Sequence, residues 1–181
     1  VADDEWTTVP VASGITWSRL RASDLMEGDQ TVNLIEVETG HGWDIQPADH
    51  GGCSRVSTKA SALGAVVAVN GGFFSGGCGT LDLLKADGTL YSTNTMTRVD
   101  DVTSETIAIP QRSMGWNSWG DVSFEWISHG DGWGSKSNAM GGFPSLVIGG
   151  VGAAEAEPDT SVYSGGDWAK NPRTAVGVGG D

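Results

Sequence analysis

The stretch SMGWNSWGDVSFEWI, Ser113 to Ile127, predicts that this chain is built mainly of β-strands. Over Val122–Trp126 an apolar residue stands at every second position, with Ser123 and Glu125 between them. A period of two is typical of a strand with one face against the core and the other in water. The flanking glycines and tryptophans continue a pattern of short strands broken by turns.

Other stretches carry similar signals. Strands are predicted at TVNLIEVETG (31–40), VVAVN (66–70), LDLLKADGTLY (81–91), TIAIP (106–110), FPSLVIGG (143–150) and RTAVGVGGD (173–181). The apolar runs VVAVN and FPSLVIGG are expected to be buried. Asp87-Gly88 is a residue pair that favours a hairpin turn between the two halves of its stretch.

Helical signals are few. RVSTKASALGA (55–65) predicts a short helix, because it combines a serine suited to capping with a run of alanines. SHGDGWGSKSNAMGG (128–142) is expected to form a long polar loop, and loops of that length inside a domain are usually functional. The chain is therefore predicted to be a single α+β domain over residues 1–181, with a twisted mixed or antiparallel sheet, few short helices and glycine-rich turns.

Composition excludes some classes of function. The 181 residues carry 23 acidic and 10 basic side chains, a formal net charge of -13, so a nucleic-acid backbone is not an expected partner. No stretch approaches 18 apolar residues, so no membrane span is expected. Eight tryptophans in a chain of this size argue against disorder.

The two cysteines, Cys53 and Cys78, allow two interpretations. They are either buried thiols or a disulfide in an exported protein, and we favour the disulfide. It would close a loop that contains NGGFF and contribute about 3.5 kcal/mol on the chain-entropy model. The polar start VADDEWTTVP suits either a mature secreted N-terminus or the start of a recombinant chain, and secretion is the predicted localisation.

Five stretches, in order, resemble one family. They are AVNGGFF (68–74), CGTLDLLKADGTLY (78–91), RSMGWNSWGDVSFEW (112–126), GGFPSLVIGG (141–150) and PRTAVGVGGD (172–181). In this order they are similar to the phosphodiester glycosidase family, which includes an enzyme that removes N-acetylglucosamine from a phosphodiester on mannose. The resemblance implies a hydrolase that cleaves a glycosyl phosphodiester, with an N-acetylhexosamine 1-phosphodiester as the expected substrate.

The resemblance implies that Asn70, Gly71 and Gly72 line a substrate pocket, although Asn-Gly is also the strongest short signal for a tight turn. An Asn amide both donates and accepts hydrogen bonds, and glycines let backbone N–H groups approach an anion. Arg173 is expected to hold the phosphate through its planar fork of donors, with Thr174 adding a hydroxyl.

Carboxylates that could direct water at the anomeric carbon are numerous. Asp82 and Asp181 are the candidate catalytic groups, whereas Glu125 is expected to be solvated. A phosphate leaves as a stable anion, so a single base can suffice.

Further residues of the chain are site candidates. Gly142 and Ser145, beside Gly141, are candidate substrate-binding residues that could equally serve a turn, and His129 is expected to be a solvated loop residue.

Members of the family usually continue beyond the RTA stretch, whereas this sequence stops at Asp181. The resemblance therefore implies an incomplete domain and makes the chain's own C-terminal fragment a possible second polypeptide. The expected ligand is a carbohydrate or glycosyl phosphate. Two cysteines and three scattered histidines predict no zinc site, no cofactor is expected, and a bound Ca²⁺ is left open.

Two other functions fit the residues. One is a glycosidase of the same fold that acts on a phosphate-free polysaccharide. The other is a non-catalytic carbohydrate-binding module, for which Trp116, Trp119 and Trp133 are the candidate stacking platforms, because their glycine-rich surroundings could leave them exposed.

Overall fold

The computed structural model describes residues 5–23, 28–48, 53–100, 102–118, 121–142, 145–152 and 174–179. These residues form one helix and twelve strands. The elements are β1 (Thr7–Ala12), β2 (Ile15–Ala22), β3 (Gln30–Val37), α1 (Val56–Leu63), β4 (Leu84–Ala86), β5 (Thr89–Ser92), β6 (Thr97–Val99), β7 (Thr106–Ala108), β8 (Gln111–Trp116), β9 (Val122–Ile127), β10 (Asn138–Gly141), β11 (Val147–Ile148) and β12 (Val151–Gly152). Every described strand pairing is antiparallel, which confirms an α+β fold with few helices.

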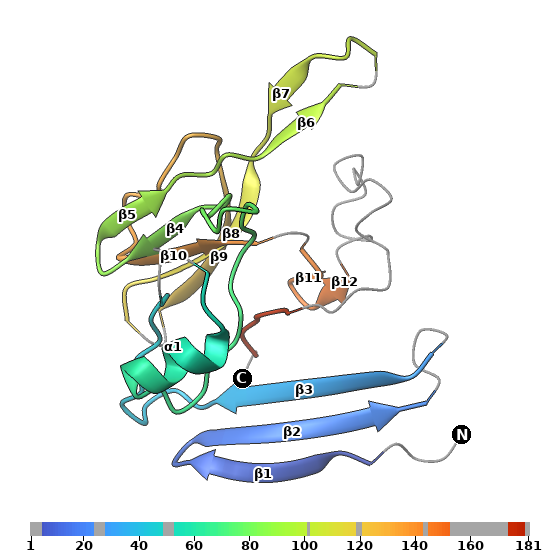
Figure 1. Cartoon of the computed structure of the whole chain (residues 1–181), viewed down its shortest axis with the longest axis vertical. Coiled ribbons are helices and arrows are strands. Elements are labelled where there is room, and N and C mark those ends of the chain that lie inside the picture. Colours follow the sequence, from blue (N-terminus) through green and yellow to red (C-terminus); the bar gives the residue numbers. More distant parts are fainter. Residues whose placement is uncertain are drawn as a thin grey trace.

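A five-stranded sheet in the order β5-β4-β10-β8-β9 forms the centre of the molecule (Figure 1). The SMGWNSWGDVSFEWI stretch supplies β8 and β9, a hairpin with Met114 opposite Phe124. The one-sided burial predicted for β9 is only partly correct. Trp126 is 38% exposed, and the Arg112 guanidinium lies 5.4 Å from the centre of its ring. β9 is the edge strand of this sheet, so its side chains have a neighbouring strand on one side only.

The predicted hairpin at Asp87-Gly88 is confirmed. Both residues have positive φ, 47° and 77°, the backbone that a two-residue type I′ turn requires. The turn is held by the Asp87 N–H, which donates to Asn138 Oδ1 at 2.9 Å, and by the Gly88 N–H, which donates to the Ser137 carbonyl at 2.8 Å. The turn between β4 and β5 is thereby fixed against the start of β10.

The prediction of a long polar loop over 128–142 is wrong at its C-terminal end. Residues Asn138–Gly141 form β10, a central strand between β4 and β8. Ala139 is fully buried and joins Leu83, Ile127 and Trp133 in the core cluster. At the end of this strand Gly141 leaves no space for a side chain, because a methyl group there would lie 2.5 Å from Gln111 Oε1.

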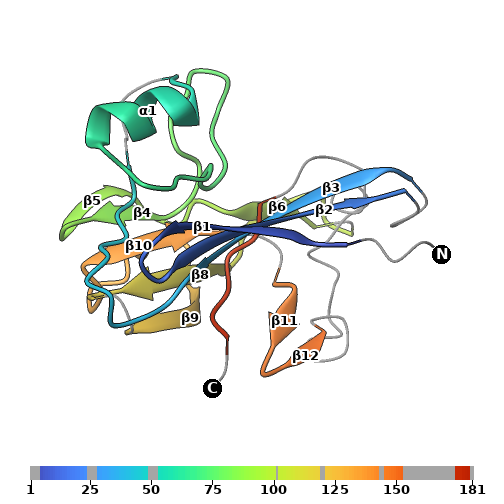
Figure 2. The same cartoon turned by 90° about the horizontal axis from the view of Figure 1, so that it is seen from below.

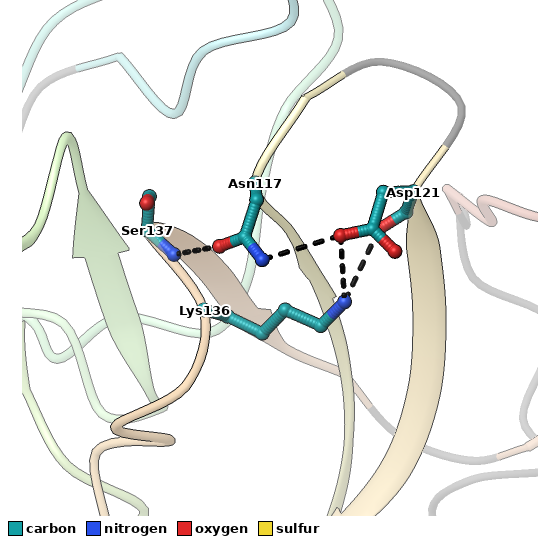
Figure 3. A network of polar contacts seen from close by, with 4 residues as sticks. All are labelled: Asn117, Asp121, Lys136 and Ser137. Atoms are coloured by element: carbon teal, nitrogen blue, oxygen red, sulfur yellow. Dashed lines mark hydrogen bonds and ion pairs between the residues drawn. The ribbon is translucent and has the colours of Figure 1, made fainter.

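A polar network ties the rest of that loop to the β8–β9 connection (Figure 3). Lys136 is buried, and its Nζ donates to the Asp121 carbonyl at 3.2 Å and lies 3.3 Å from Asp121 Oδ2. Asn117 donates from Nδ2 to the same carboxylate at 3.2 Å and accepts from the Ser137 N–H at 2.8 Å. Lys136 is the buried member of this network, and its ammonium group has the hydrogen-bond partners that a buried polar group requires.

Strands β1, β2 and β3 form a separate sheet at the lower edge of Figure 1. The strand predicted at 31–40 is confirmed as β3, and Trp17 of β2 lies opposite Ile35 of β3. The segment after β3 returns to the first hairpin, where the Trp43 indole N–H donates to the Ser13 carbonyl at 2.7 Å.

The predicted helix is confirmed, but its capping differs from the prediction. α1 begins after Arg55, whose side chain makes no capping hydrogen bond. It ends at Gly64, which adopts the left-handed conformation, with the Ala65 N–H donating to the Ala60 carbonyl at 2.9 Å. This pattern is the glycine-dependent Schellman termination. Figure 2 shows α1 and the β11–β12 hairpin on opposite sides of the molecule.

Three apolar stretches do not form the strands predicted for them. Residues 66–70 have no strand and Val69 is 61% exposed, the described residues 174–179 have no strand, and 145–152 holds only the two-residue strands β11 and β12. The apolar pattern indicated burial, but a buried strand also needs a neighbour that pairs with it and covers it. No described strand takes that place beside residues 66–70 or 174–179, and β11 pairs only with the two-residue strand β12.

Candidate functional site

The carboxyl group of Asp82 lies beneath the NGGFF loop and is fully buried. Its Oδ2 accepts a hydrogen bond from the Phe73 N–H at 2.6 Å, and its Oδ1 accepts from Gln111 Nε2 at 2.7 Å. Burial raises the pKa of Asp82, and the hydrogen bonds from Phe73 and Gln111 oppose that rise in part. From this position the side chain fixes the backbone of the loop.

Two glycines permit this close packing. A methyl group on Gly72 would lie 2.8 Å from Asp82 Oδ2 and 3.1 Å from the Gly141 carbonyl oxygen. A methyl group on Gly141 would lie 2.5 Å from Gln111 Oε1 and 2.9 Å from Asp82 Cβ. The loop, the buried acid and β10 therefore meet at a point where only hydrogen fits. The family resemblance gave Gly72 a role in substrate binding, and the geometry adds a packing role.

Asn70 and Thr174 lie in contact although 104 residues separate them in the sequence. The Thr174 hydroxyl donates to Asn70 Oδ1 at 2.5 Å. Because the amide oxygen is engaged, the amide N–H groups of Asn70 are the ones left to face a ligand. Two segments that sequence reasoning assigned to one pocket are thus side by side.

The loop also offers backbone donors. Gly71 and Gly72 are exposed, and within the described residues their N–H groups donate no hydrogen bond. The next N–H, that of Phe73, is directed inward to Asp82. Asn70, Gly71 and Gly72 therefore gather several hydrogen-bond donors at the surface, an arrangement suited to an anion or to sugar hydroxyl groups.

The other predicted site residues are placed as follows. The Gly142 N–H donates to the Arg112 carbonyl at 3.0 Å, which fixes it beside β8. Ser145 has a buried hydroxyl without a hydrogen-bond partner in the described part of the chain. Arg173 and Asp181 lie outside the described residues. Their roles stay predictions.

Two of the three tryptophans proposed as exposed sugar platforms are buried. Trp116 and Trp133 are 3% and 6% exposed. Trp116 donates its indole N–H to the Ile45 carbonyl at 2.9 Å, and Trp133 belongs to the core cluster. Glycine neighbours give these rings room to pack inward, as at Gly115, where a methyl group would lie 2.6 Å from the Trp133 ring. Trp119 lies outside the described residues.

Gln111 is the residue of this cluster that sequence reasoning missed. It opens β8, is fully buried and holds Asp82, while its Oε1 has no partner among the described residues. A glutamine after a proline at a strand start carries no sequence signal for burial. Only the pairing of β8 with β10, and of β10 with β4, brings it to an acid 29 residues away.

The predicted disulfide Cys53–Cys78 is present, with the two Cα atoms 5.3 Å apart. It joins the segment before α1 to the turn that follows the NGGFF loop, so α1 and the loop lie within the stretch of chain that it closes. Disulfides are typical of oxidising compartments. In the described ranges no helix is long and apolar enough to cross a membrane, and no cluster of metal-binding side chains is found.

His129 and Glu125 are both exposed, as expected for solvated side chains.

No protein-family model matches the chain, and neither does any curated protein or solved structure.

Proposed function

We propose that the chain is a hydrolase that cleaves a glycosyl phosphodiester, with an N-acetylhexosamine 1-phosphodiester as substrate. The observation that carries this proposal is the hydrogen bond from Thr174 to Asn70. It joins the NGG and RTA segments, the two stretches that the phosphodiester glycosidase resemblance assigns to substrate binding. The disulfide favours an exported protein that works in an oxidising compartment.

The donors of the loop support recognition of a phosphate. The amide N–H groups of Asn70 and the backbone N–H groups of Gly71 and Gly72 offer hydrogen bonds to anionic oxygens. Arg173 precedes Thr174 in the sequence and is the proposed bidentate partner of the phosphate. A net charge of -13 disfavours polyanions but leaves room for one locally neutralised phosphate.

The proposed reaction is hydrolysis at the anomeric carbon. Water adds to C1, the bond from C1 to the phosphate oxygen breaks, and its electron pair leaves on the phosphate. A carboxylate accepts the proton of the attacking water, and the products are a free sugar and a phosphate monoester. Asp181 is the proposed base. Asp82, fully buried with both oxygens engaged, is proposed to position the loop.

Activity on N-acetylglucosamine linked through a 1-phosphodiester to methyl mannoside tests the proposal, with release of free N-acetylglucosamine as the readout. Thr174→Val removes one hydroxyl, and kcat/KM is expected to fall about five- to tenfold because Asn70 loses its orientation. Thr106→Val, on the exposed face of β7, is the matched control and is expected to be unchanged. Absence of sugar release by the unmodified chain would refute the proposal.

The two alternatives predict different results. A phosphate-free glycosidase would hydrolyse aryl glycosides and ignore the phosphodiester. A carbohydrate-binding module would bind sugars without turnover, but the burial of Trp116 and Trp133 removes two of its three candidate platforms.

A further inference from the structure

A hollow on the three-stranded sheet has a chemistry unlike the rest of the chain. It has a volume of about 310 Å³ and is lined by Glu5, Thr7, Trp17, Arg19 and Arg21. Two of the ten basic side chains of a strongly acidic chain thus meet in one place. Its size falls at the lower end of the range for small-molecule sites.

Strand geometry explains why these side chains gather. Positions 17, 19 and 21 of β2 alternate, so they stand on one face of the sheet at intervals of about 7 Å. The register places Thr7 of β1 and Asn33 of β3 on either side of Arg19. β1 to β3 lie at the lower edge of Figure 1, apart from the central sheet. The lining of the hollow shares no residue with the Asn70 site.

Neither arginine is neutralised within the described residues. Among the described residues no ion pair joins Arg19 or Arg21 to a carboxylate, although Glu5 lines the same hollow and Asp29 lines a neighbouring one with Arg21. The Nε of Arg19 is buried and has no hydrogen-bond partner in the described part of the chain. A buried donor without an acceptor is unfavourable, and a bound anion would supply the acceptor.

The aromatic side chain of the hollow is held in place. The Trp17 indole N–H donates to Asn33 Oδ1 at 3.2 Å. A fixed, half-buried indole offers an apolar surface on which the face of a sugar ring can stack, and its polar edge is already satisfied. Arginine forks beside such a surface match the acidic groups of a charged sugar.

We propose that this hollow is a binding site for an anionic saccharide, a sugar that carries a carboxylate or phosphate group. Trp17 stacks on the ring, and Arg19 and Arg21 hold the acidic group. The proposal does not rest on the proposed hydrolase activity, because none of these residues belongs to the Asn70 site.

Isothermal titration calorimetry of the full chain tests it, with trigalacturonate and glucose 6-phosphate as charged probes and maltotriose and glucose as their neutral counterparts. Binding of either charged probe, weakened by added salt, with the neutral counterpart silent, is the expected result. Arg19→Gln and Arg21→Gln are each expected to weaken binding about tenfold or more. Glu5→Gln is expected to strengthen it, because it removes the opposing charge. Arg55→Gln, an exposed arginine before α1, is the control and should change nothing.

Arg21 is exposed, so its variant tests the site without affecting the core. Equal binding of charged and neutral probes would overturn the proposal. So would no binding of either charged probe, or binding that both arginine variants retain. Dimerisation that the arginine variants abolish, without binding of a charged sugar, would assign the hollow to a second copy of the chain instead.

Discussion

Asp82 offers the sharpest test of how the loop is held. Asp82→Ala would leave the Phe73 N–H and the Gln111 amide without their buried acceptor. Each buried donor left unpaired costs about 1–3 kcal/mol, and removal of the buried carboxylate returns part of that cost. We expect the free energy of unfolding to fall by about 2–4 kcal/mol.

Asp82→Asn is the matched variant, since it keeps the volume and one acceptor. The new amide oxygen at position 82 can accept a hydrogen bond from the Phe73 N–H. The new amide N–H can donate to Gln111 Oε1 once the side-chain amide of Gln111 flips. Gln111 Oε1 has no hydrogen-bond partner among the described residues. A flip of the Gln111 amide therefore breaks only its existing hydrogen bond to residue 82, and the new bond to residue 82 replaces it. We expect a loss of about 1 kcal/mol or less.

The pH dependence of stability distinguishes the protonated form of Asp82 from its ionised form. Because the folded-state pKa of Asp82 is raised, the folded chain binds this proton more tightly than the unfolded chain does. The pH-dependent part of the contribution of Asp82 to stability is fully present below its unfolded pKa, near 3.9, and is lost as the pH rises through the higher folded value. The stability of the unmodified chain relative to Asp82→Asn should therefore fall as the pH rises from about 4.

Urea unfolding followed by tryptophan fluorescence, repeated at several pH values between 4 and 8, measures both effects. The account of the buried acid is refuted if Asp82→Asn costs as much as Asp82→Ala. It is equally refuted if the difference between Asp82→Asn and the unmodified chain does not change with pH.

Two further predictions concern the surroundings of the loop. Gly141→Ala is expected to destabilise the fold by about 2–3 kcal/mol, because its methyl group meets the fully buried Gln111. Gly142→Ala, with open space around the added carbon, should stay within about 0.5 kcal/mol, and equal losses in urea unfolding would contradict this packing. Replacing both Cys53 and Cys78 by serine should lower stability by about 3.5 kcal/mol, as the loop between them regains its freedom when unfolded. A change below 1 kcal/mol in the same assay would argue against the entropic account.

Local signals predicted the parts of the fold that depend on local chemistry. Asp87-Gly88 specifies a turn whatever surrounds it, and Gly64 ends a helix through its own backbone. Apolar runs were less informative. They indicate that a stretch favours burial, but they do not indicate which element of the fold would cover it. Val69 is therefore exposed in a stretch predicted to be a buried strand.

The candidate site also has one part that the sequence indicated and another that depends on contacts between distant strands. Asn70 and Thr174 were named from a resemblance carried by stretches between residues 68 and 181, and the structure places their side chains in contact. The burial of Asp82 and the presence of Gln111 beside it follow from the order of strands in the central sheet. Strand order depends on contacts between distant residues, and no local pattern in these stretches encodes it.

Hydrolysis of the N-acetylglucosamine 1-phosphodiester in water enriched in oxygen-18, followed by early mass analysis of both products, tests the central claim most directly. Attack at C1 predicts the heavy oxygen in the released sugar and an unlabelled phosphate monoester. Arg173→Gln is expected to slow the release of sugar strongly, because the phosphate loses its bidentate partner. Heavy oxygen in the phosphate, or no release of sugar, would contradict the proposal that the chain cleaves glycosyl phosphodiesters at C1.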